Sequence, residues 1–282
     1  MTNYELDLFG SYVKTGTDNS DKLKALDELF LKSAGFRKST DYLDLLNFIN
    51  RFPKLSPFNA FLIHTQNPGV QVVLSALQWA AYKRVVNEFA RPLVILVPFG
   101  PVNFVYDIAD TSGEPVPDYL MNPFLTKGDL DPSVYQLTIS NSQRENISII
   151  ENSMQKSSAG FAKKDKNGFK IVLNKSYGLN EKYSTIVHEL AHIFCGHLGS
   201  IISGKWQDRS HVDRQIREIE AESISYLVCN RLGLKTSSDS YLAGYISEND
   251  TMPPISFDSV LTVSFIIEQM GSSKYKPKAK KE

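Results

Sequence analysis

The sequence His188-Glu189-Leu190-Ala191-His192 constrains the fold of this 282-residue chain more than any other feature. Residues four apart share one face of an α-helix, so a helix directs both imidazoles at a single metal ion. The carboxylate of the intervening glutamate then lies beside the same ion, where it can take a proton from water. The motif therefore predicts a helical metal site in which Glu189 is the catalytic base.

A catalytic zinc site needs a third protein ligand and an open position for water. The carboxylates of Glu218 and Glu222 are the candidates, because they share one face of a second predicted helix. We expect Glu218 to be the ligand and Glu222 to accept a hydrogen bond from a ligand imidazole, and the exchange of these two roles is the alternative. Ala221 and Ser225 are small and let this helix approach the motif helix. Glu220 points elsewhere and is expected to be solvated.

The other cysteines and histidines near the motif have simpler expected roles. Cys195 lies on the same face as the two motif histidines, but a fourth protein ligand would close the site and leave the predicted base without a function. We therefore expect Cys195 and Cys229 to be small buried apolar residues. His197 follows the helix end and is expected to form a local hydrogen bond, whereas His211 is expected to be exposed.

Hydrophobic periodicity and turn residues divide the chain into helices and strands. Helices are expected near residues 26–31, 42–49, 58–66, 74–89, 135–140, 180–196, 210–233, 241–246 and 258–270. Strands are expected near residues 93–97, 104–108, 147–151, 158–163 and 169–174, with residues 164–168 as a hairpin turn. Ser56 is predicted to cap the third helix, and Ser210 to cap the helix that carries Glu218.

The composition excludes several classes of protein. Hydrophobic residues make up 42% of the chain and charged residues 22%, which permits a packed core. The 31 basic residues equal the 31 acidic ones, so the chain is not a polycation that coats nucleic acid. No apolar run reaches the roughly 18 residues of a membrane helix. Two cysteines and an N-terminus without signal-peptide features predict a cytoplasmic protein with no membrane partner.

Residues 185–199 around the motif, and residues 217–229 on the second helix, resemble the ImmA/IrrE-type zinc metallopeptidases. The N-terminal half resembles the ArdC-like single-stranded-DNA-binding domain that is joined to some of them. The segments that follow the order of that domain are Ser56-Pro-Phe-Asn59, Gln66-Asn-Pro68, Trp79, Arg84-Val85, residues 93–98, Val105-Tyr-Asp107 and residues 110–113. Lys83 and Phe89 depart from the pattern, since such domains usually have glycine at both places.

The resemblance implies an α+β fold in which an N-terminal α/β domain of the ssDNA-binding type precedes a small gluzincin-like zinc metallopeptidase domain. The expected boundaries are residues 1–20 for a flexible N-terminus, 21–115 for the ArdC-like domain, 116–133 for a linker rich in proline and glycine, 134–270 for the peptidase domain and 271–282 for a basic disordered tail without core residues. The implied cofactor is Zn²⁺, with His188, His192 and Glu218 as its ligands.

The same resemblance implies an antirestriction or regulatory protein of a mobile element. Its partners would be single-stranded DNA and a protein substrate such as a repressor or a restriction-related protein. Seven basic residues and three acidic ones lie between positions 36 and 91, and this excess could line a track for phosphates. The cations nominated for DNA contact are Arg51, Lys54, Lys83, Arg84 and Arg91. Stacking faces could come from Tyr42, Phe52, Phe58, Trp79 and Tyr82, although aromatic residues at helical spacing usually belong to a core.

Two rival interpretations stay open. In the first, the chain is a peptidase whose N-terminal domain docks one specific protein, such as a repressor, instead of DNA. In the second, the chain is a non-catalytic DNA-binding protein, and the zinc only stabilises its fold.

Overall fold

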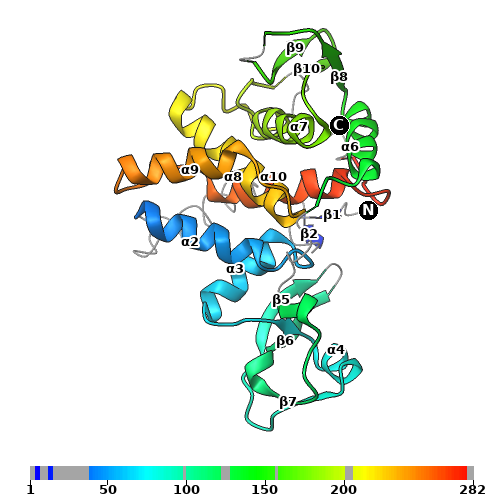
Figure 1. Cartoon of the computed structure of the whole chain (residues 1–282), viewed down its shortest axis with the longest axis vertical. Helices are drawn as coiled ribbons and strands as arrows, with labels where there is room; N and C mark the ends of the chain where they lie inside the picture. The colour runs from blue at the N-terminus through cyan, green and yellow to red at the C-terminus, as the bar shows by residue number, and fades with distance from the viewer. Residues whose placement is uncertain are drawn as a thin grey trace. The chain divides into compact units, whose positions relative to one another are not determined.

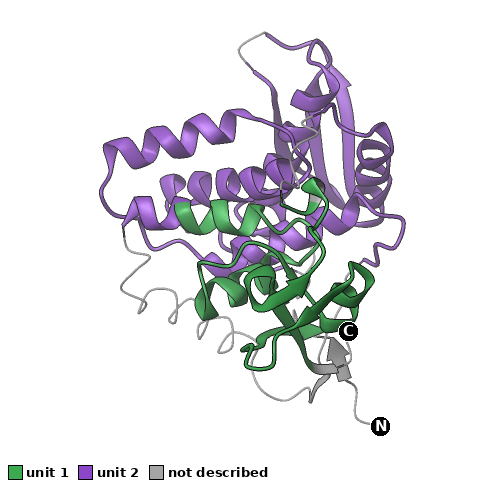
Figure 2. Ribbon diagram, turned by 60° about the horizontal axis from the view of Figure 1, so that its bottom comes forward, with its two compact units in different colours: residues 1–25, 44–126 green, residues 26–43, 127–282 purple. Residues whose placement is uncertain are grey.

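The computed structural model describes residues 4–6, 12–14, 38–97, 100–121, 128–155, 158–200 and 206–277. It combines helices with small sheets, which confirms the predicted α+β class (Figure 1). Two compact units comprise residues 1–25 with 44–126 and residues 26–43 with 127–282 (Figure 2). Of the N-terminus that was predicted to be flexible, the structure describes only β1 (Tyr4–Leu6) and β2 (Tyr12–Lys14), which pair antiparallel. The helix predicted near residues 26–31 and the last five residues of the tail lie outside the described residues.

The first unit packs short helices against small antiparallel sheets. Its elements are part of α2 (Ser39–Asn50), α3 (Pro57–Gln66), β3 (Val73–Leu74), α4 (Ala76–Ala81), β4 (Arg84–Val86), β5 (Leu93–Val97), β6 (Gly100–Asp107), the 3-10 turn η2 (Ile108–Asp110), β7 (Thr111–Gly113) and α5 (Asp118–Met121). One sheet has the order β3-β6-β5, and β4 pairs with β7. The side chain of Ser56 accepts a hydrogen bond from the Asn59 N–H and caps α3, as predicted.

Two amide side chains of α3 cover the outer edge of β5. Asn59 donates to the Leu96 carbonyl at 2.8 Å and accepts from the Leu96 N–H at 3.0 Å. Gln66 forms the same pair of hydrogen bonds with Val94, both at 2.8 Å. An exposed strand edge invites pairing with other chains, so these two amides take the place of a missing strand. The spacing of seven residues, two helical turns, matches every second residue of the strand.

The helix predicted over residues 74–89 is wrong in its second half. α4 ends at Ala81, and Lys83 adopts the left-handed backbone conformation with φ 55°, which an α-helix does not contain. The chain then forms β4, which pairs with β7 in the register Arg84 opposite Gly113. Glycine adopts a positive φ at no steric cost, so a glycine would suit this position better than Lys83 does.

The second unit contains the hairpin and the two long helices that the sequence predicts. Its elements after α2 are α6 (Pro132–Arg144), β8 (Ile147–Asn152), β9 (Gly160–Asp165), β10 (Gly168–Asn174), α7 (Leu179–Phe194), α8 (Arg214–Arg231), α9 (Ser237–Glu248) and α10 (Phe257–Met270). β10 lies in the middle of the sheet, parallel to β8 and antiparallel to β9, which confirms the predicted hairpin. Figure 1 shows α7 between this sheet and α8.

The packing of α7 on α8 forms the centre of the second unit. Side chains of α7 such as Ile186 and Leu190, and side chains of α8 such as Ile224 and Leu227, are completely buried. Ala221 is also fully buried, in accord with the small residues expected where the helices meet. Burial of four such aliphatic side chains contributes roughly 1.5–3 kcal/mol for each of them, so this contact holds the two helices in one relative position.

Two predictions about the ends of elements are wrong. Asp213, not Ser210, caps α8, because its side chain accepts a hydrogen bond from the Gln215 N–H. Ser210 instead donates to Asp208 through both its hydroxyl and its N–H, in the turn that precedes the helix. The tail does contain a core residue: Tyr275 is 8% exposed, and its hydroxyl donates to the buried Glu145.

Residues 116–133, predicted as a linker, contain α5 and the beginning of α6. Asp131 caps α6 by accepting a hydrogen bond from the Ser133 N–H. Leu130 is buried, and its N–H donates to the side chain of Asn180 on α7 at 3.0 Å. The end of this segment is therefore part of the second unit's packing.

Replacement of Lys83 by glycine should stabilise the first unit. A left-handed backbone costs an L-residue roughly 1–2 kcal/mol, and glycine avoids that cost but loses more entropy on folding, so we expect a net gain of about 0.5–1 kcal/mol. The measurement is chemical denaturation followed by the fluorescence of Trp79 in a Trp206→Phe background, since these are the two tryptophans and lie in different units.

The matched control is Val85→Gly, two residues further along in β4, which should destabilise the unit because glycine weakens a strand. A denaturation midpoint of Lys83→Gly below that of the wild type would contradict the assignment of backbone strain to this position.

Candidate metal centre and predicted DNA contacts

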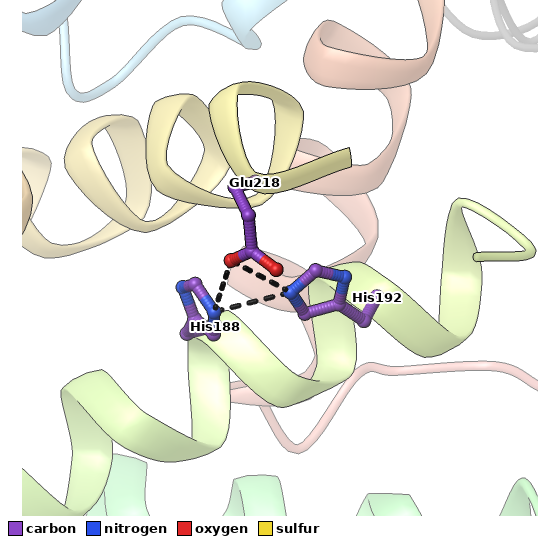
Figure 3. A group of neighbouring side chains, drawn as sticks. All are labelled: His188, His192 and Glu218. Carbon is purple, nitrogen blue, oxygen red and sulfur yellow. Dashed lines mark hydrogen bonds and ion pairs between the residues drawn. The ribbon is translucent and has the colours of Figure 1, made fainter. Parts of the chain in front are cut away.

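The three predicted metal ligands converge between α7 and α8. Figure 3 shows His188 and His192 on α7 directed toward Glu218 on α8. The two Nε2 atoms are 3.1 Å apart, and Oε2 of Glu218 lies 3.7 Å from His188 Nε2 and 3.6 Å from His192 Nε2. The spacing of four residues within the helix aligns the two rings, and the packing of α8 brings the carboxylate to them.

These distances fit a divalent metal ion. Around a tetrahedral zinc ion with bonds of about 2.0–2.2 Å, neighbouring ligand atoms are separated by about 3.3–3.6 Å. The three separations of 3.1, 3.6 and 3.7 Å lie close to that edge length. Two imidazole nitrogens and one carboxylate oxygen form a donor set that zinc and several other first-row metals accept. The residues present therefore suit a three-ligand site with an open position.

Glu222 lies behind one of the rings, one helical turn after Glu218. Its Oε1 is 3.4 Å from Nδ1 of His188, the nitrogen that faces away from the cluster. The proximity of His192 lowers the pKa of Glu218 and keeps its carboxylate ionised. Of the two carboxylates, only Glu218 approaches both Nε2 atoms, which is the arrangement expected for the ligand rather than for the outer hydrogen-bond partner.

Glu189, the predicted base, is half-buried beside these residues. Burial raises the pKa of its carboxyl group, while His188 and a hydrogen bond from the Ala162 N–H act in the opposite direction. A raised pKa makes a carboxylate a better proton acceptor near neutral pH. Ala162 belongs to β9, so the bond also places Glu189 next to the edge strand of the three-stranded sheet.

The neighbouring residues do not join this cluster. Cys195 is buried, as expected, and groups with His197 and Glu220 rather than with the three ligands. Cys229 is buried too, and His211 is exposed in the turn before α8. His197 forms the local hydrogen bonds that were predicted, with His192 at 3.0 Å and with Glu220 at 2.8 Å.

The prediction that Glu220 is solvated is wrong. Its side chain is completely buried and forms an ion pair with Arg209. The sequence does contain a signal for this, because Ile224 and Leu227 follow at four and seven residues and place Glu220 on the apolar side of α8. Burial alone would raise the pKa of Glu220, but hydrogen bonds from His197, Arg209 and the Ser256 N–H outweigh it and lower the pKa.

Two of the cations nominated for DNA contact have structural partners. The guanidinium of Arg84 donates to the carbonyls of Thr111 at 2.8 Å and Glu114 at 2.6 Å, so it holds β4 to the segment around β7. Arg51 donates to the Val70 carbonyl at 2.6 Å and lies over the rings of Phe48 and Phe52.

The other three nominated cations are exposed. Lys83 forms a surface ion pair with Glu114 at 3.0 Å, the kind of pair that contributes at most about 1 kcal/mol. Lys54 and Arg91 have exposed side chains in the first unit. The structure therefore divides the predicted phosphate contacts into two arginines whose guanidinium groups bind backbone carbonyls and three exposed cations.

The aromatic residues divide in the same way. Tyr42, Phe52 and Trp79 are buried, and the indole N–H of Trp79 donates to the Tyr106 carbonyl at 2.9 Å. Phe58 and Tyr82 are half-buried. The most exposed aromatic side chain among the described residues is Phe89, at 90%. Phe89 was singled out in the sequence only as a departure from glycine.

Among the residues that the structure describes, no helix is both long and apolar enough to cross a membrane. No curated protein matches the chain in sequence. The chain is similar to two crystal structures of the antirestriction ArdC protein from R388 plasmid, one metal-free and one Mn(II)-bound. They share 13% and 14% sequence identity with it at a TM-score of 0.40, and the match covers 83% of this chain and 98% and 99% of theirs.

The family comparison covers the segment that runs from the end of α6 to α8. Residues 142–229 match the IrrE N-terminal-like domain, Peptidase_M78. This stretch contains the motif helix, the hairpin before it and all three glutamates of α8. The predicted resemblance to ImmA/IrrE-type proteins is thereby confirmed for residues 142–229, which are similar to the IrrE N-terminal-like domain of Peptidase_M78.

Proposed function

We propose that this protein is a zinc-dependent endopeptidase with His188, His192 and Glu218 as metal ligands and Glu189 as the general base. One observation carries the proposal: two Nε2 atoms and one carboxylate oxygen converge at ligand spacing beside a half-buried glutamate whose pKa is raised. The similarity of residues 142–229 to the IrrE N-terminal-like domain of Peptidase_M78 supports the same chemistry.

The residues of the chain have separate tasks in this reaction. A bound zinc ion lowers the pKa of water toward neutrality and polarises a carbonyl group. Glu189 accepts the proton of the attacking water and delivers it to the leaving amine of the cleaved peptide bond. Glu222, whose Oε1 lies 3.4 Å from Nδ1 of His188, holds that ring so that its Nε2 lone pair is directed at the metal position.

The position of β9 favours an extended peptide as the substrate. β9 is an edge strand of the described sheet, and its Ala162 N–H reaches Glu189. Unpaired backbone groups of an edge strand can bind an extended chain as an additional strand. A protein segment laid along β9 would then pass the predicted base. A repressor or a restriction-related protein is the substrate that the resemblance to ImmA/IrrE-type proteins suggests.

We further propose that the first unit binds single-stranded DNA, as expected for an antirestriction or regulatory protein of a mobile element. Phe89 and Arg91 are both exposed on the short turn between β4 and β5. Binding of single strands combines aromatic faces that stack on bases with cations that contact phosphates. An exposed ring two residues from an exposed guanidinium provides both groups on one segment. Lys83 adds a further exposed positive charge to the same unit.

The metal proposal predicts different losses for the two candidate carboxylates. Glu218→Ala and His188→Ala each remove a ligand, so the purified proteins should retain no stoichiometric zinc after dialysis. Glu222→Ala removes only a hydrogen-bond partner and should weaken zinc binding by about 10–100-fold. Elemental analysis and competition with a chelator measure both effects, with the exposed Glu248→Ala as the control. Loss of zinc from Glu222→Ala but not from Glu218→Ala would exchange the two roles.

The base proposal predicts that Glu189→Gln binds zinc normally but cleaves at least about 100-fold more slowly, because an amide cannot accept the proton. A protein substrate captured on this inactive variant and identified by mass spectrometry provides the assay. Glu181→Gln, an exposed change in the first turn of the same helix, should cleave at the wild-type rate. Equal cleavage by Glu189→Gln and the wild type would contradict the assignment of Glu189 as the general base.

The DNA proposal predicts that Phe89→Ala and Arg91→Glu weaken binding to a fluorescent oligothymidylate measured by anisotropy. Loss of a stacked ring costs about 1–3 kcal/mol. Loss of one phosphate contact should lower the salt slope by about 0.7. The exposed Lys166→Glu, in the hairpin turn of the second unit, is the charge control.

Two conservative changes at the same position separate stacking from apolar docking. Phe89→Trp should retain DNA binding, whereas Phe89→Leu, which is still apolar but has no ring, should not. If the wild type shows no affinity for the oligonucleotide at moderate ionic strength, the protein-docking rival replaces this proposal.

A further inference from the structure

A chain of side-chain contacts extends from the metal centre into the core of the second unit. His192 directs Nε2 at the other ligands, and its Nδ1 lies 3.0 Å from Nδ1 of His197. Nε2 of His197 lies 2.8 Å from Oε2 of Glu220. Arg209 then donates to both carboxylate oxygens of Glu220, at 2.7 Å each. His197 and Glu220 are completely buried.

Only one arrangement of protons on two neutral rings satisfies every contact in this chain. A metal ligand presents an unprotonated Nε2, so His192 carries its proton on Nδ1. That proton points at Nδ1 of His197, which must therefore be the acceptor. His197 consequently carries its proton on Nε2 and donates it to Glu220. A doubly protonated His197 would place two N–H groups against each other at 3.0 Å.

The buried carboxylate is itself fixed from several sides. Besides Arg209 and His197, Glu220 accepts the Ser256 N–H at 2.7 Å, so its two oxygens receive four hydrogen bonds. Arg209 comes from the segment before α8, and Ser256 is the N-cap residue of α10. Three separate segments therefore hold Glu220, and a carboxylate with this many donors cannot rotate away from His197.

The turn after α7 brings His197 back beneath His192. Gly196 has φ 74°, and the His197 N–H donates to the His192 carbonyl at 2.9 Å. A Cβ atom on Gly196 would lie 1.8 Å from the Gln207 carbonyl oxygen, so no other residue fits there. The backbone thus presents His197 in one position relative to His192.

The same contacts exclude a second metal site at Cys195, His197 and Glu220, although these three residues lie close together. Both oxygens of Glu220 already accept hydrogen bonds. The positive charge of the Arg209 guanidinium would repel a metal cation placed beside them. These contacts suit the cluster to hold the His197 ring in one orientation and not to bind a metal ion.

We propose that His197, Glu220 and Arg209 form a positioning relay that holds His192 in its Nδ1–H tautomer and aims its Nε2 at the metal ion. The inference rests on the proposed metal site, in which His192 is a ligand. Glu222 supports His188 directly. The relay supports His192 in the same way, but through the ring of His197. These are positioning residues, because none of them touches the metal position.

The direct test is long-range ¹H–¹⁵N correlation spectroscopy of the histidine rings in the full chain, before and after addition of Zn²⁺. We expect His192 as the Nδ1–H tautomer and His197 as the Nε2–H tautomer in both samples. Ring signals that average between tautomers, or an Nε2–H tautomer of His192 in the metal-free protein, would overturn the relay. This readout does not depend on activity, so it separates failure of the relay from failure of the proposed peptidase function.

A second measurement uses variants and a chelator competition for Zn²⁺. His197→Phe keeps a ring but removes the acceptor, and it should weaken zinc binding by about 10–100-fold. Cys195→Ala, a change in the same buried cluster, should lower thermal stability without changing the zinc affinity. Equal loss of affinity in both variants would assign His197 a merely structural role. If His197→Phe does not fold, the tautomers of the wild type still decide the matter.

Discussion

The ion pair between Glu220 and Arg209 lies at the point where four segments of the second unit meet. The turn after α7, the segment before α8, α8 itself and the beginning of α10 each contribute a group to it. An ionised carboxylate costs several kcal/mol to bury unless donors surround it, so these segments must all arrive at their positions together. The ligand Glu218 lies two residues before Glu220 on α8, so the metal centre depends on the same arrangement.

The three glutamates of α8 show how helical periodicity assigns different tasks to one residue type. Glu218 and Glu222 are four residues apart and share the face that meets His188. Glu220 is rotated by about 200° from Glu218, so it enters the core on the other side of the helix. There it meets His197, which the turn at Gly196 carries around the end of α7. One face of α8 thus meets the ligand imidazoles directly, and the other face supports His192 through His197.

In the first unit, basic residues that suggest a phosphate track are partly structural. Arg84 satisfies carbonyl groups of a short strand pair that has little core of its own. Lys83 takes the backbone conformation that ends α4 and lets β4 begin. The ring of Phe89, by contrast, is almost fully exposed on a nearby turn. Charge counts in a sequence do not distinguish between these roles, because a guanidinium binds a carbonyl or a phosphate with the same geometry.

The sequence alone determined the features that arise from local periodicity. The spacing of His188 and His192 predicted a shared helical face, the run before it predicted the β9–β10 hairpin, and Ser56 predicted the start of α3. Tertiary structure decided which residues far apart in the chain meet. It buried Glu220 against Arg209, drew Tyr275 onto Glu145, and ended α4 early so that β4 could pair with β7. Local patterns indicate which face of an element a residue occupies. The partner on that face is determined only in the packed chain, because it depends on long-range burial and hydrogen bonding.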